Sequence, residues 1–302
     1  MDRYQAMATF VRVVETGSFS AAARQLRVGQ PAVSKIIAQL EARLQVSLLV
    51  RSTHGLSPTE AGQFYFERAR ASIQEADEAE LAARGAGAGL TGKLRVSAPT
   101  TFARLRIVPC LPEFLAAHPG LDIELILDDR VIDLVAEGID VSMRMGSLPD
   151  STAVARKLAT SPRAVMATPA YLERAGEPHS PADLAAHETL VYSQQTNVWS
   201  FMRDGTAASV AVRGRVRLSA MEGLRAAVLA DLGLTIASEW VFAEELASGH
   251  VRKVLTSWQL PPVDLWALFP AGRMASAKAR LFVSFVEGLM REGAAIPPRN
   301  NT

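Results

Sequence analysis

The sequence predicts an α/β protein with a small helical module at its amino terminus, a long connecting helix and two open α/β lobes. Three observations predict this organisation. Residues 4–44 carry three closely spaced helical patterns, residues 59–84 carry one long helical pattern, and strand-like and helix-like runs alternate from residue 93 onward. With 302 residues, of which 49% are hydrophobic and 21% charged, the chain has the length of two domains and the composition of an ordinary globular protein.

Composition and spacing exclude several classes of protein. No stretch approaches the roughly 18 consecutive apolar residues that a membrane span needs, and residues 1–10 lack the basic and apolar regions of a secretory signal. We therefore expect a cytoplasmic protein with no membrane partner.

The single cysteine, Cys110, forms no disulfide within the chain and no cysteine-rich zinc site, so we expect no metal. Residues 87–92 have the glycine spacing of a dinucleotide-binding loop, but a helix precedes them and a strand follows, which is the reverse of that motif. We expect no cofactor.

The amino-terminal module begins with two helices that a short turn separates. Met7, Phe10 and Val14 fall on one face of a first helix, which Gly17 ends. Ser18 supplies a cap oxygen for a second helix over 21–26, whose alanines permit the close approach of a neighbouring helix. A third helix begins at Gln30 after a short break, with its proline in the first turn, where a missing N–H costs nothing.

The third helix has an apolar face and a polar face. Its apolar residues step by three and four, and we expect them to face inward: Val33, Ile36, Ile37, Leu40 and Leu44. The opposite face contains Gln30, Pro31, Ser34, Lys35 and Ala38. Glutamine, serine and lysine can bond to base edges or phosphates in a major groove, and residues 1–58 hold seven basic side chains against three acidic ones. The alternative is an ordinary solvated face.

A two-stranded wing is expected to follow the third helix. Residues 48–51 and 56–57 read as short strands, and the polar residues 52–55 between them read as the tip. Arg51 and His54 are the candidate contacts to a DNA backbone or minor groove, although either can equally be an exposed side chain with no specific partner. The module is thus expected to be a winged helix-turn-helix.

The long helix is expected to pair two chains. Residues 57–60 have the pattern of a capping box with proline in the first turn, and the helix should run to about residue 84. Small residues recur along one face in steps of three and four, which permits close pairing of two helices. The residues proposed for this dimerisation face are Tyr65, Ala69, Ser72, Ala76 and Ala79. The alternative is a helix that packs only on its own domain.

The remainder of the chain has a βαβαβ pattern that occurs twice. The first set has strands over 94–98, 123–127 and 141–144, with helices through Phe114 and over 131–137. The second set has strands over 164–167, 190–192 and 234–237, with helices over 170–174 and 221–230. Ligands of open α/β sheets bind beyond the carboxyl ends of the strands, where helix N-termini present N–H groups.

The order of these parts resembles that of the LysR-type transcriptional regulators over essentially the whole chain. Matching segments at the amino terminus are residues 19–23, Leu26, residues 30–34, residues 40–41, Arg51 and residues 59–62, and later ones are residues 140–144, 169–172 and 233–234. Four positions depart from the usual family pattern. Gln45 replaces glycine and Leu49 replaces phenylalanine, which should alter the turn into the wing, while His54 replaces a frequent arginine and Pro58 replaces leucine.

The resemblance implies a division of the chain into three parts. Residues 1–58 would bind DNA, residues 59–91 would form the linker helix and a glycine-rich hinge, and residues 92–302 would bind an effector. The effector domain would consist of two lobes like those of a periplasmic binding protein, with lobe one over 92–161 and 267–302 and lobe two over 162–266. The positions expected to bind the effector are Thr100, Thr101, Arg144, Gly146, Ser193, Trp199, Ala237 and Ser238. Hydroxyls and N–H groups at helix N-termini favour an anionic ligand such as a small carboxylate.

The function expected is that of a sequence-specific DNA-binding regulator, which reads an inverted repeat as a homodimer or homotetramer and responds to a small molecule. One alternative is a solute-binding protein, which the absent secretory signal and the amino-terminal helices oppose. The other is an enzyme, but neither G-x-S-x-G nor H-E-x-x-H occurs and the five histidines are scattered. We therefore expect no catalytic residues.

Overall fold

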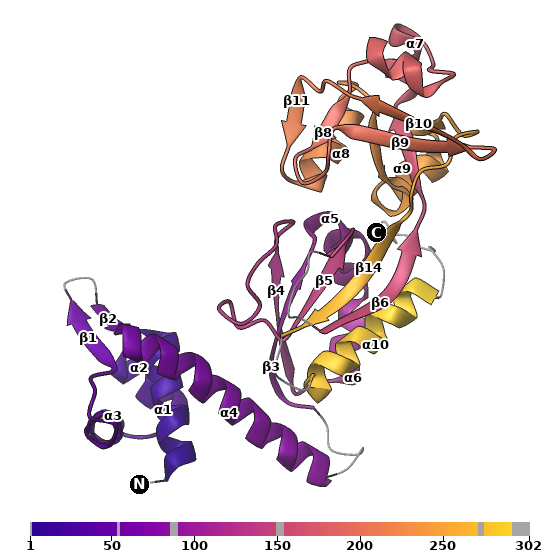
Figure 1. The fold of residues 1–302 in the computed structure, drawn as a ribbon. Coiled ribbons are helices and arrows are strands. Elements are labelled where there is room, and N and C mark those ends of the chain that lie inside the picture. Colours follow the sequence, from indigo (N-terminus) through magenta and orange to yellow (C-terminus); the bar gives the residue numbers. More distant parts are fainter. Residues whose placement is uncertain (1, 53–54, 85–89, 149–153, 271–274, 292–302) are drawn as a thin grey trace, which may run out of the picture. The chain divides into compact units, whose positions relative to one another are not determined.

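The computed structural model describes residues 2–52, 55–84, 90–148, 154–270 and 275–291 (Figure 1). The chain forms two compact units, Met1–Leu90 and Thr91–Thr302, which we describe separately. Within the described ranges, no helix combines the length and the hydropathy that crossing a membrane requires.

The first unit is a helix-turn-helix with a two-stranded wing and a long following helix. Its elements are α1 (Arg3–Thr16), α2 (Phe19–Leu26), α3 (Gln30–Leu44), β1 (Leu49–Ser52), β2 (Gly55–Pro58) and α4 (Glu60–Arg84). Gly17 ends α1 in the left-handed conformation, with φ of 60°, and the Ser18 hydroxyl caps α2 by accepting the Ala21 N–H at 3.4 Å. Strands β1 and β2 pair antiparallel, as a wing requires.

The core of the first unit lies between α1, α2 and α3. Phe10, Val33 and Leu40 are fully buried there, and the Tyr65 ring of α4 contacts the Phe10 ring edge-on with centroids 5.3 Å apart. Two expectations need correction. Leu44, expected to face inward, is 37% exposed in the last turn of α3, and the cap of α4 is Thr59 rather than Ser57, because Pro58 belongs to β2.

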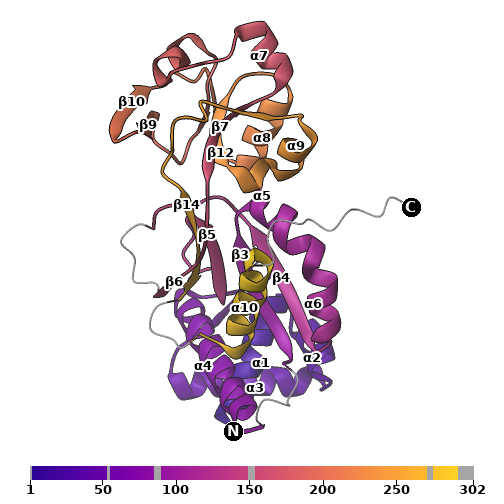
Figure 2. The ribbon, with the colours of Figure 1, turned by 90° about the vertical axis from the view of Figure 1, so that its right-hand side faces the viewer.

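Lobe one of the second unit is a five-stranded sheet of order β4-β3-β5-β14-β6. Strand β3 is parallel to β4 and β5, while β14 is antiparallel to β5 and β6. Helices α6 and α10 lie side by side on the sheet, where the Phe114 and Phe282 rings meet edge-on at 5.7 Å (Figure 2). The strands and helices are β3 (Gly92–Ala98), α5 (Thr100–Phe102), α6 (Leu111–Ala117), β4 (Leu121–Leu127), β5 (Val141–Met145), β6 (Val154–Ser161), β14 (Val263–Phe269) and α10 (Ala277–Arg291).

Lobe two contains three smaller sheets. Strands β12, β7 and β13 form an antiparallel sheet, β11 pairs parallel with β8, and β9 and β10 form a hairpin. Its elements are β7 (Arg163–Ala167), α7 (Pro169–Ala175), β8 (Leu190–Tyr192), β9 (Val198–Arg203), β10 (Thr206–Ala211), β11 (Val216–Leu218), α8 (Met221–Leu229), β12 (Thr235–Ser238), α9 (Ala243–Ser248) and β13 (Arg252–Val254).

Several expectations for the second unit differ from the structure. The helix expected over 131–137 is a series of turns, because the Asp133 carboxylate accepts the N–H groups of Val135 and Ala136 and Gly138 ends the turn at a φ of 62°. The second βαβαβ set does not form a parallel sheet, since β12 runs antiparallel to β7. Strand β14 pairs with lobe one from Val263, which is earlier in the chain than the boundary expected at residue 267.

Candidate functional site

The polar face of α3 is open to solvent. Gln30, Pro31, Lys35 and Ala38 are exposed and Ser34 is half-buried, while Val33 and Ile37 on the opposite face are buried in the core. Gly29 precedes the helix and provides no side-chain cap, and its carbonyl accepts the N–H groups of Ala32 and Val33 at 3.0 and 3.4 Å. Because Pro31 has no N–H, the Gln30 N–H is the donor left for a partner outside the helix, at the positive end of the helix dipole. This end of α3 can therefore donate to phosphates while the exposed side chains reach base edges.

The turn from α3 into the wing is held by side chains that bond to the backbone. The Glu41 carboxylate accepts the N–H groups of Leu48 and Leu49 at 2.7 and 3.1 Å, and the Thr59 hydroxyl donates to the Ser47 carbonyl at 2.8 Å. The backbone of Arg51 pairs with that of Leu56 in the wing. The role of the Arg51 side chain as a DNA contact stays a prediction. His54, the other predicted contact in the wing, lies outside the described residues.

The predicted dimerisation face of α4 divides into two parts. Tyr65 packs against the core of its own unit, and Ala69 is 2% exposed, so both of these side chains are already in contact with their own chain. Farther along α4, Ser72 and Ala79 are exposed and Ala76 is half-buried. Only this second part offers a surface that another helix can cover.

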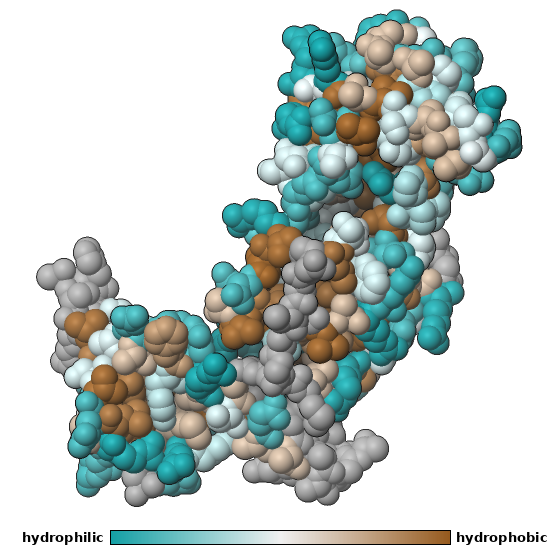
Figure 3. Space-filling view, viewed as in Figure 1, coloured by the Kyte–Doolittle hydropathy of each residue, from teal (hydrophilic) through white to brown (hydrophobic). Residues whose placement is uncertain are grey.

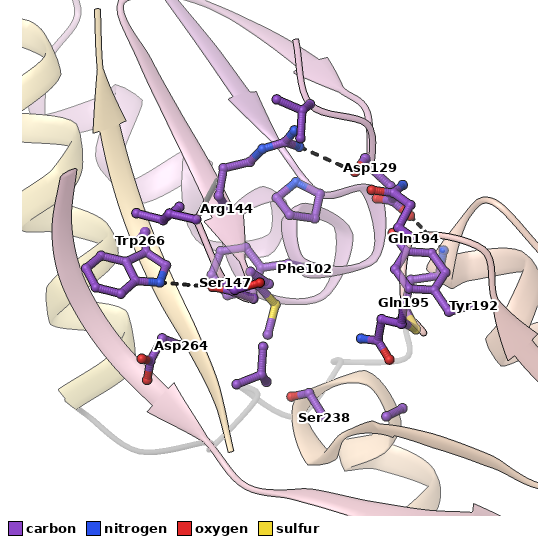
Figure 4. A pocket seen from close by; sticks show the side chains of 18 of the residues that line it. Phe102, Asp129, Arg144, Ser147, Tyr192, Gln194, Gln195, Ser238, Asp264 and Trp266 are labelled. Atoms are coloured by element: carbon purple, nitrogen blue, oxygen red, sulfur yellow. Dashed lines mark hydrogen bonds between the residues drawn. The ribbon is translucent and has the colours of Figure 1, made fainter. Parts of the chain in front are cut away.

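A cavity of about 1050 Å³ lies between the two lobes of the second unit. Figure 3 shows the hollow between the lobes, with hydrophilic and hydrophobic residues at its border. Lobe one contributes α5, β5 and the turns after β4, and lobe two contributes the segment after β8 and the end of β12 (Figure 4). Cavities of this size accommodate small molecules.

Six of the eight expected effector positions line the cavity: Thr101, Arg144, Gly146, Trp199, Ala237 and Ser238. Thr100 and Ser193 are not among the lining residues, and their role as ligand contacts remains a prediction. The Thr100 N–H donates instead to the Asp129 carboxylate at 2.9 Å. Trp199 is 6% exposed and belongs to the hydrophobic core of lobe two, so much of its surface is used in packing.

Ser238 and Gly146 have structural partners at the edges of the cavity. The Ser238 hydroxyl bonds to the Ser161 hydroxyl at 2.6 Å, where the chain passes from lobe one to lobe two. Gly146 has a φ of 109°, which favours glycine, and its carbonyl accepts the Trp266 indole N–H at 3.0 Å.

Two buried arginines give the cavity its most distinctive chemistry. Arg106 and Arg144 are each 9% exposed, and burial lowers the pKa of both guanidinium groups. Arg144 donates only weakly, to the Asp128 and Asp129 carbonyls at 3.5 and 3.4 Å. Among the described residues, Nε and Nη2 of Arg106 and Nη2 of Arg144 have no hydrogen-bond partner. Unpaired buried donors of this kind are costly, and a ligand's acidic group would satisfy them.

Two buried hydroxyls in the cavity are also without a partner among the described residues. Thr101 is 1% exposed and Ser142 is fully buried, and neither side-chain oxygen makes a hydrogen bond. All four side chains with unused donors, namely Thr101, Arg106, Ser142 and Arg144, come from lobe one. A ligand with hydrogen-bond acceptor atoms would supply partners for these donors.

The acidic side chains that line the cavity already have partners. Asp264 accepts from Lys157 and from the Thr160 hydroxyl, each at 2.7 Å, and these contacts lower the pKa of its carboxyl. Asp129 accepts two backbone N–H groups. The unused donors are therefore not balanced by an unused acceptor on these two carboxylates.

Aromatic side chains supply apolar surface beside the arginines. The Phe102 and Trp240 rings lie 6.1 Å apart, one from each lobe, and Tyr192 and Trp266 also line the cavity. Burial, together with the nearby Asp129 carboxylate, raises the pKa of Tyr192, so its hydroxyl stays protonated as a donor. A small ligand with an acidic group and an apolar body matches this lining.

Sequence reasoning missed Arg106, Asp129 and Ser142. Asp129 is the second residue after β4, so the rule that selected Thr100 and Thr101 after β3 would also have selected it. Arg106 stands in an apolar segment whose helical turns the sequence does not distinguish from ordinary core. Ser142 lies two residues before Arg144 on the same face of β5.

Two family models match the chain in succession. Residues 4–63 match the bacterial regulatory helix-turn-helix protein of the lysR family, and residues 87–291 match the LysR substrate binding domain.

Known regulators match this chain over most of their own length. An HTH-type transcriptional regulator of Xanthomonas campestris pv. campestris (strain 8004) is 37% identical over 283 residues, which are 92% of this chain and 82% of the relative. The HTH-type transcriptional activator AaeR of Escherichia coli (strain K12) is 32% identical over 272 residues, covering 89% of this chain and 88% of AaeR. The solved structure of CrgA, a LysR-type transcriptional regulator from Neisseria meningitidis, matches with a TM-score of 0.60 and 29% identity over 97% of this chain and 99% of CrgA.

The resemblance found in the sequence is confirmed, since the two family models match in the expected order and the second alone covers more than half of the chain. The chain belongs to the LysR-type transcriptional regulators, a family of helix-turn-helix regulators with an effector-binding domain and not of enzymes.

Proposed function

We propose that this regulator reads an inverted-repeat operator in double-stranded DNA through the α3 face, with Gln30, Pro31, Ser34 and Lys35 at the base edges and adjoining phosphates. The observation that carries the proposal is the exposed polar face of α3, which has no acidic side chain and begins at the uncapped, positive end of the helix dipole. Arg51 and His54 of the wing would add contacts to the DNA backbone. A regulator that acts on chromosomal DNA in this way would work in the cytoplasm.

Self-association would place two α3 helices on the two halves of the operator. The exposed part of α4, at Ser72, Ala76 and Ala79, is the surface we assign to this contact. A dimer, or a tetramer built from two dimers, would then match the two-fold symmetry of an inverted repeat. In this arrangement residues 1–58 bind DNA, residues 59–91 link and pair the chains, and residues 92–302 bind the effector.

The co-effector would be a small anionic molecule held between the lobes. Its acidic group would accept from Arg106, Arg144, Thr101 and Ser142, which supply the unused donors of the cavity. Its body would lie against aromatic surface such as that of Phe102 and Trp240. A ligand that binds one arrangement of the lobes better than another shifts the population of the regulator toward that arrangement.

The first experiment is selection of operator fragments. Purified protein is incubated with sheared genomic DNA at moderate salt, where nonspecific phosphate binding is weakened, and the retained fragments are sequenced. Enrichment of a few fragments that share a dyad supports the proposal. A folded, self-associated protein that retains all fragments equally, with and without small-molecule extract, contradicts sequence-specific reading.

A further inference from the structure

One carboxylate joins the two lobes of the sensing unit. Asp129 follows β4 at the carboxyl edge of the lobe-one sheet, where Figure 4 shows it beside Arg144 and near Tyr192. Its Oδ1 accepts the N–H of Thr100, the first residue of α5 in lobe one, at 2.9 Å. Its Oδ2 accepts the N–H of Met221, the first residue of α8 in lobe two, at 2.6 Å.

Helix α8 has no cap from its own lobe. The residue before it is Ala220, which provides no side-chain hydrogen bond, so the first N–H of the helix depends on a group from elsewhere. Asp129 supplies that acceptor across the cavity, and its negative charge lies at the positive end of a nine-residue helix. The Asp129 charge also acts on Tyr192 of lobe two, whose pKa burial and this nearby carboxylate raise.

The other contacts across this side of the cavity are weaker in kind. Arg104 of lobe one pairs with Glu222 of lobe two at 3.0 Å, but both side chains are more than one third exposed, and exposed ion pairs contribute little. Ser161 and Ser238 bond where the chain itself crosses between lobes. Asp129 is thus the partly buried charged contact that connects separate elements of the two lobes.

We propose that Asp129 is an internal anion that closes the two lobes by capping α8 from lobe one. Because its carboxylate occupies the start of α8, the acidic group of a ligand is directed to the unused donors of Arg106 and Arg144. The contact between Asp129 and α8 then forms in the closed arrangement and breaks when the lobes separate. The link from this closure to DNA binding rests on the proposed function, whereas the closure itself does not.

The test compares two adjacent carboxylates in the full-length protein. Asp129→Ala removes the shared acceptor, while Asp128→Ala removes a carboxylate that pairs with the exposed Arg130. We expect the Met221 amide to exchange with deuterium at least tenfold faster in Asp129→Ala and at the original rate in Asp128→Ala. The Leu224 amide, which donates to Ala220 within α8, reports whether the helix remains formed.

Formate provides a second readout that a merely structural change would not give. A small carboxylate can occupy the space left in Asp129→Ala and accept the Met221 N–H again, so added formate should restore slow exchange, with chloride at equal ionic strength as the control. Asp129→Asn fills that space and should not respond to formate.

Three outcomes overturn the proposal. The first is an unchanged rate of amide exchange at Met221 in Asp129→Ala. The second is an equal increase in the exchange rates of Met221 and Leu224 in both Asp129 variants. The third is an effect of formate on Met221 exchange in Asp129→Ala that is no larger than the effect of chloride. All measurements are made without DNA or effector, so their result is separate from the success or failure of operator selection.

Discussion

Gln45 holds a backbone conformation that glycine adopts with less strain. It ends α3 with φ of 54° and ψ of 34°, in the left-handed region, and this is the position where the family pattern has glycine. The expected effect of this departure on the turn into the wing stays a prediction, since the left-handed conformation is also the one that glycine favours. The side chain of Gln45 is exposed and does not replace the lost conformational freedom with buried contacts.

Replacing Gln45 with glycine should stabilise the first unit. We expect Gln45→Gly to raise the free energy of unfolding by about 1 kcal/mol, because relief of the left-handed strain exceeds the added entropy of the unfolded chain. Urea unfolding followed by far-ultraviolet circular dichroism measures the change. Gln39→Gly, in the exposed interior of the same helix, is the control and should lower stability by about 1 kcal/mol. A loss of stability in Gln45→Gly contradicts the account of the turn.

Arg106 should destabilise the ligand-free protein. Replacing it with methionine removes buried donors that have no partner, so we expect Arg106→Met to raise the free energy of unfolding by about 1–3 kcal/mol. All four tryptophans lie in the second unit, so tryptophan fluorescence during urea unfolding reports that unit alone.

The control for Arg106 is an arginine that has its partners. Arg225 pairs with Glu245 and donates to the Val241 carbonyl at 3.2 Å, so Arg225→Met should instead lower stability by about 3–5 kcal/mol. Equal destabilisation by the two substitutions would show that Arg106 is satisfied in solution and would remove it from the ligand site.

Individual residues differ in how far the sequence could identify them. Helical spacing placed Gln30 and Lys35 on the exposed face of α3, because their neighbours Val33 and Ile37 had to be buried. Spacing could not identify Arg106, since the need of its guanidinium for a partner depends on burial between segments far apart in the sequence.

At the scale of elements, the wing and α4 approach each other as closely as backbone allows. A Cβ added at Gly62, in the first turn of α4, would lie 1.9 Å from the Leu48 carbonyl oxygen. The Thr59 N–H donates to the same carbonyl at 2.9 Å, so α4 and the start of the wing are fixed together.

Gly62→Ala should therefore weaken the first unit. We expect a loss of about 1–3 kcal/mol in the free energy of unfolding, because the new methyl group forces α4 away from the wing. Gly288→Ala is the matched control, since it adds the same methyl group to α10 with nothing within 4 Å and should stabilise by about 1 kcal/mol. Circular dichroism in urea measures both, and an undiminished stability of Gly62→Ala would contradict the close contact.

The exposed part of α4 carries the prediction of self-association. Ala76→Glu places a charge in the proposed contact between chains, so we expect light scattering to show monomers at concentrations where the original protein associates. Gln63→Glu adds the same charge at an exposed position of α4 outside that face and should leave the oligomer intact. An unchanged oligomer in Ala76→Glu refutes the assigned face.

Periodicity and apolar runs predicted many elements, including the short β7, β8 and β12 of lobe two, whereas β6, β14, α10 and the β9–β10 hairpin were not predicted. Periodicity located α3 through its apolar face and α4 through the small residues that recur along one of its faces. The β9–β10 hairpin was missed, since its alternating burial depends on packing against the core of lobe two rather than on strongly apolar residues. The turns over 131–137 have helical spacing, but Asp133 and Gly138 limit them to local structure.

At the scale of the whole molecule, two units with separate chemistry lie on one chain. The first unit offers an uncapped helix start and a polar face to DNA, and the second encloses a cavity with unused buried donors. The order of the units and their family were predicted from motifs along the whole sequence, and both are confirmed. Of the donors that we propose for the anion, Thr101 and Arg144 were expected from the sequence, whereas Arg106 and Ser142 were not.

In the proposed function the α3 face distinguishes base sequences, and a comparison of binding to two DNAs tests this. Affinity for a selected operator fragment and for random DNA of equal length is measured at one salt concentration for the original protein, Gln30→Ala, Ser34→Ala and the α1 control Gln5→Ala. We predict that the two α3 substitutions each cost about 1–3 kcal/mol on the operator and almost nothing on random DNA, while the exposed Gln5 substitution changes neither. Equal losses on both DNAs, or no loss at all, would contradict sequence reading by α3.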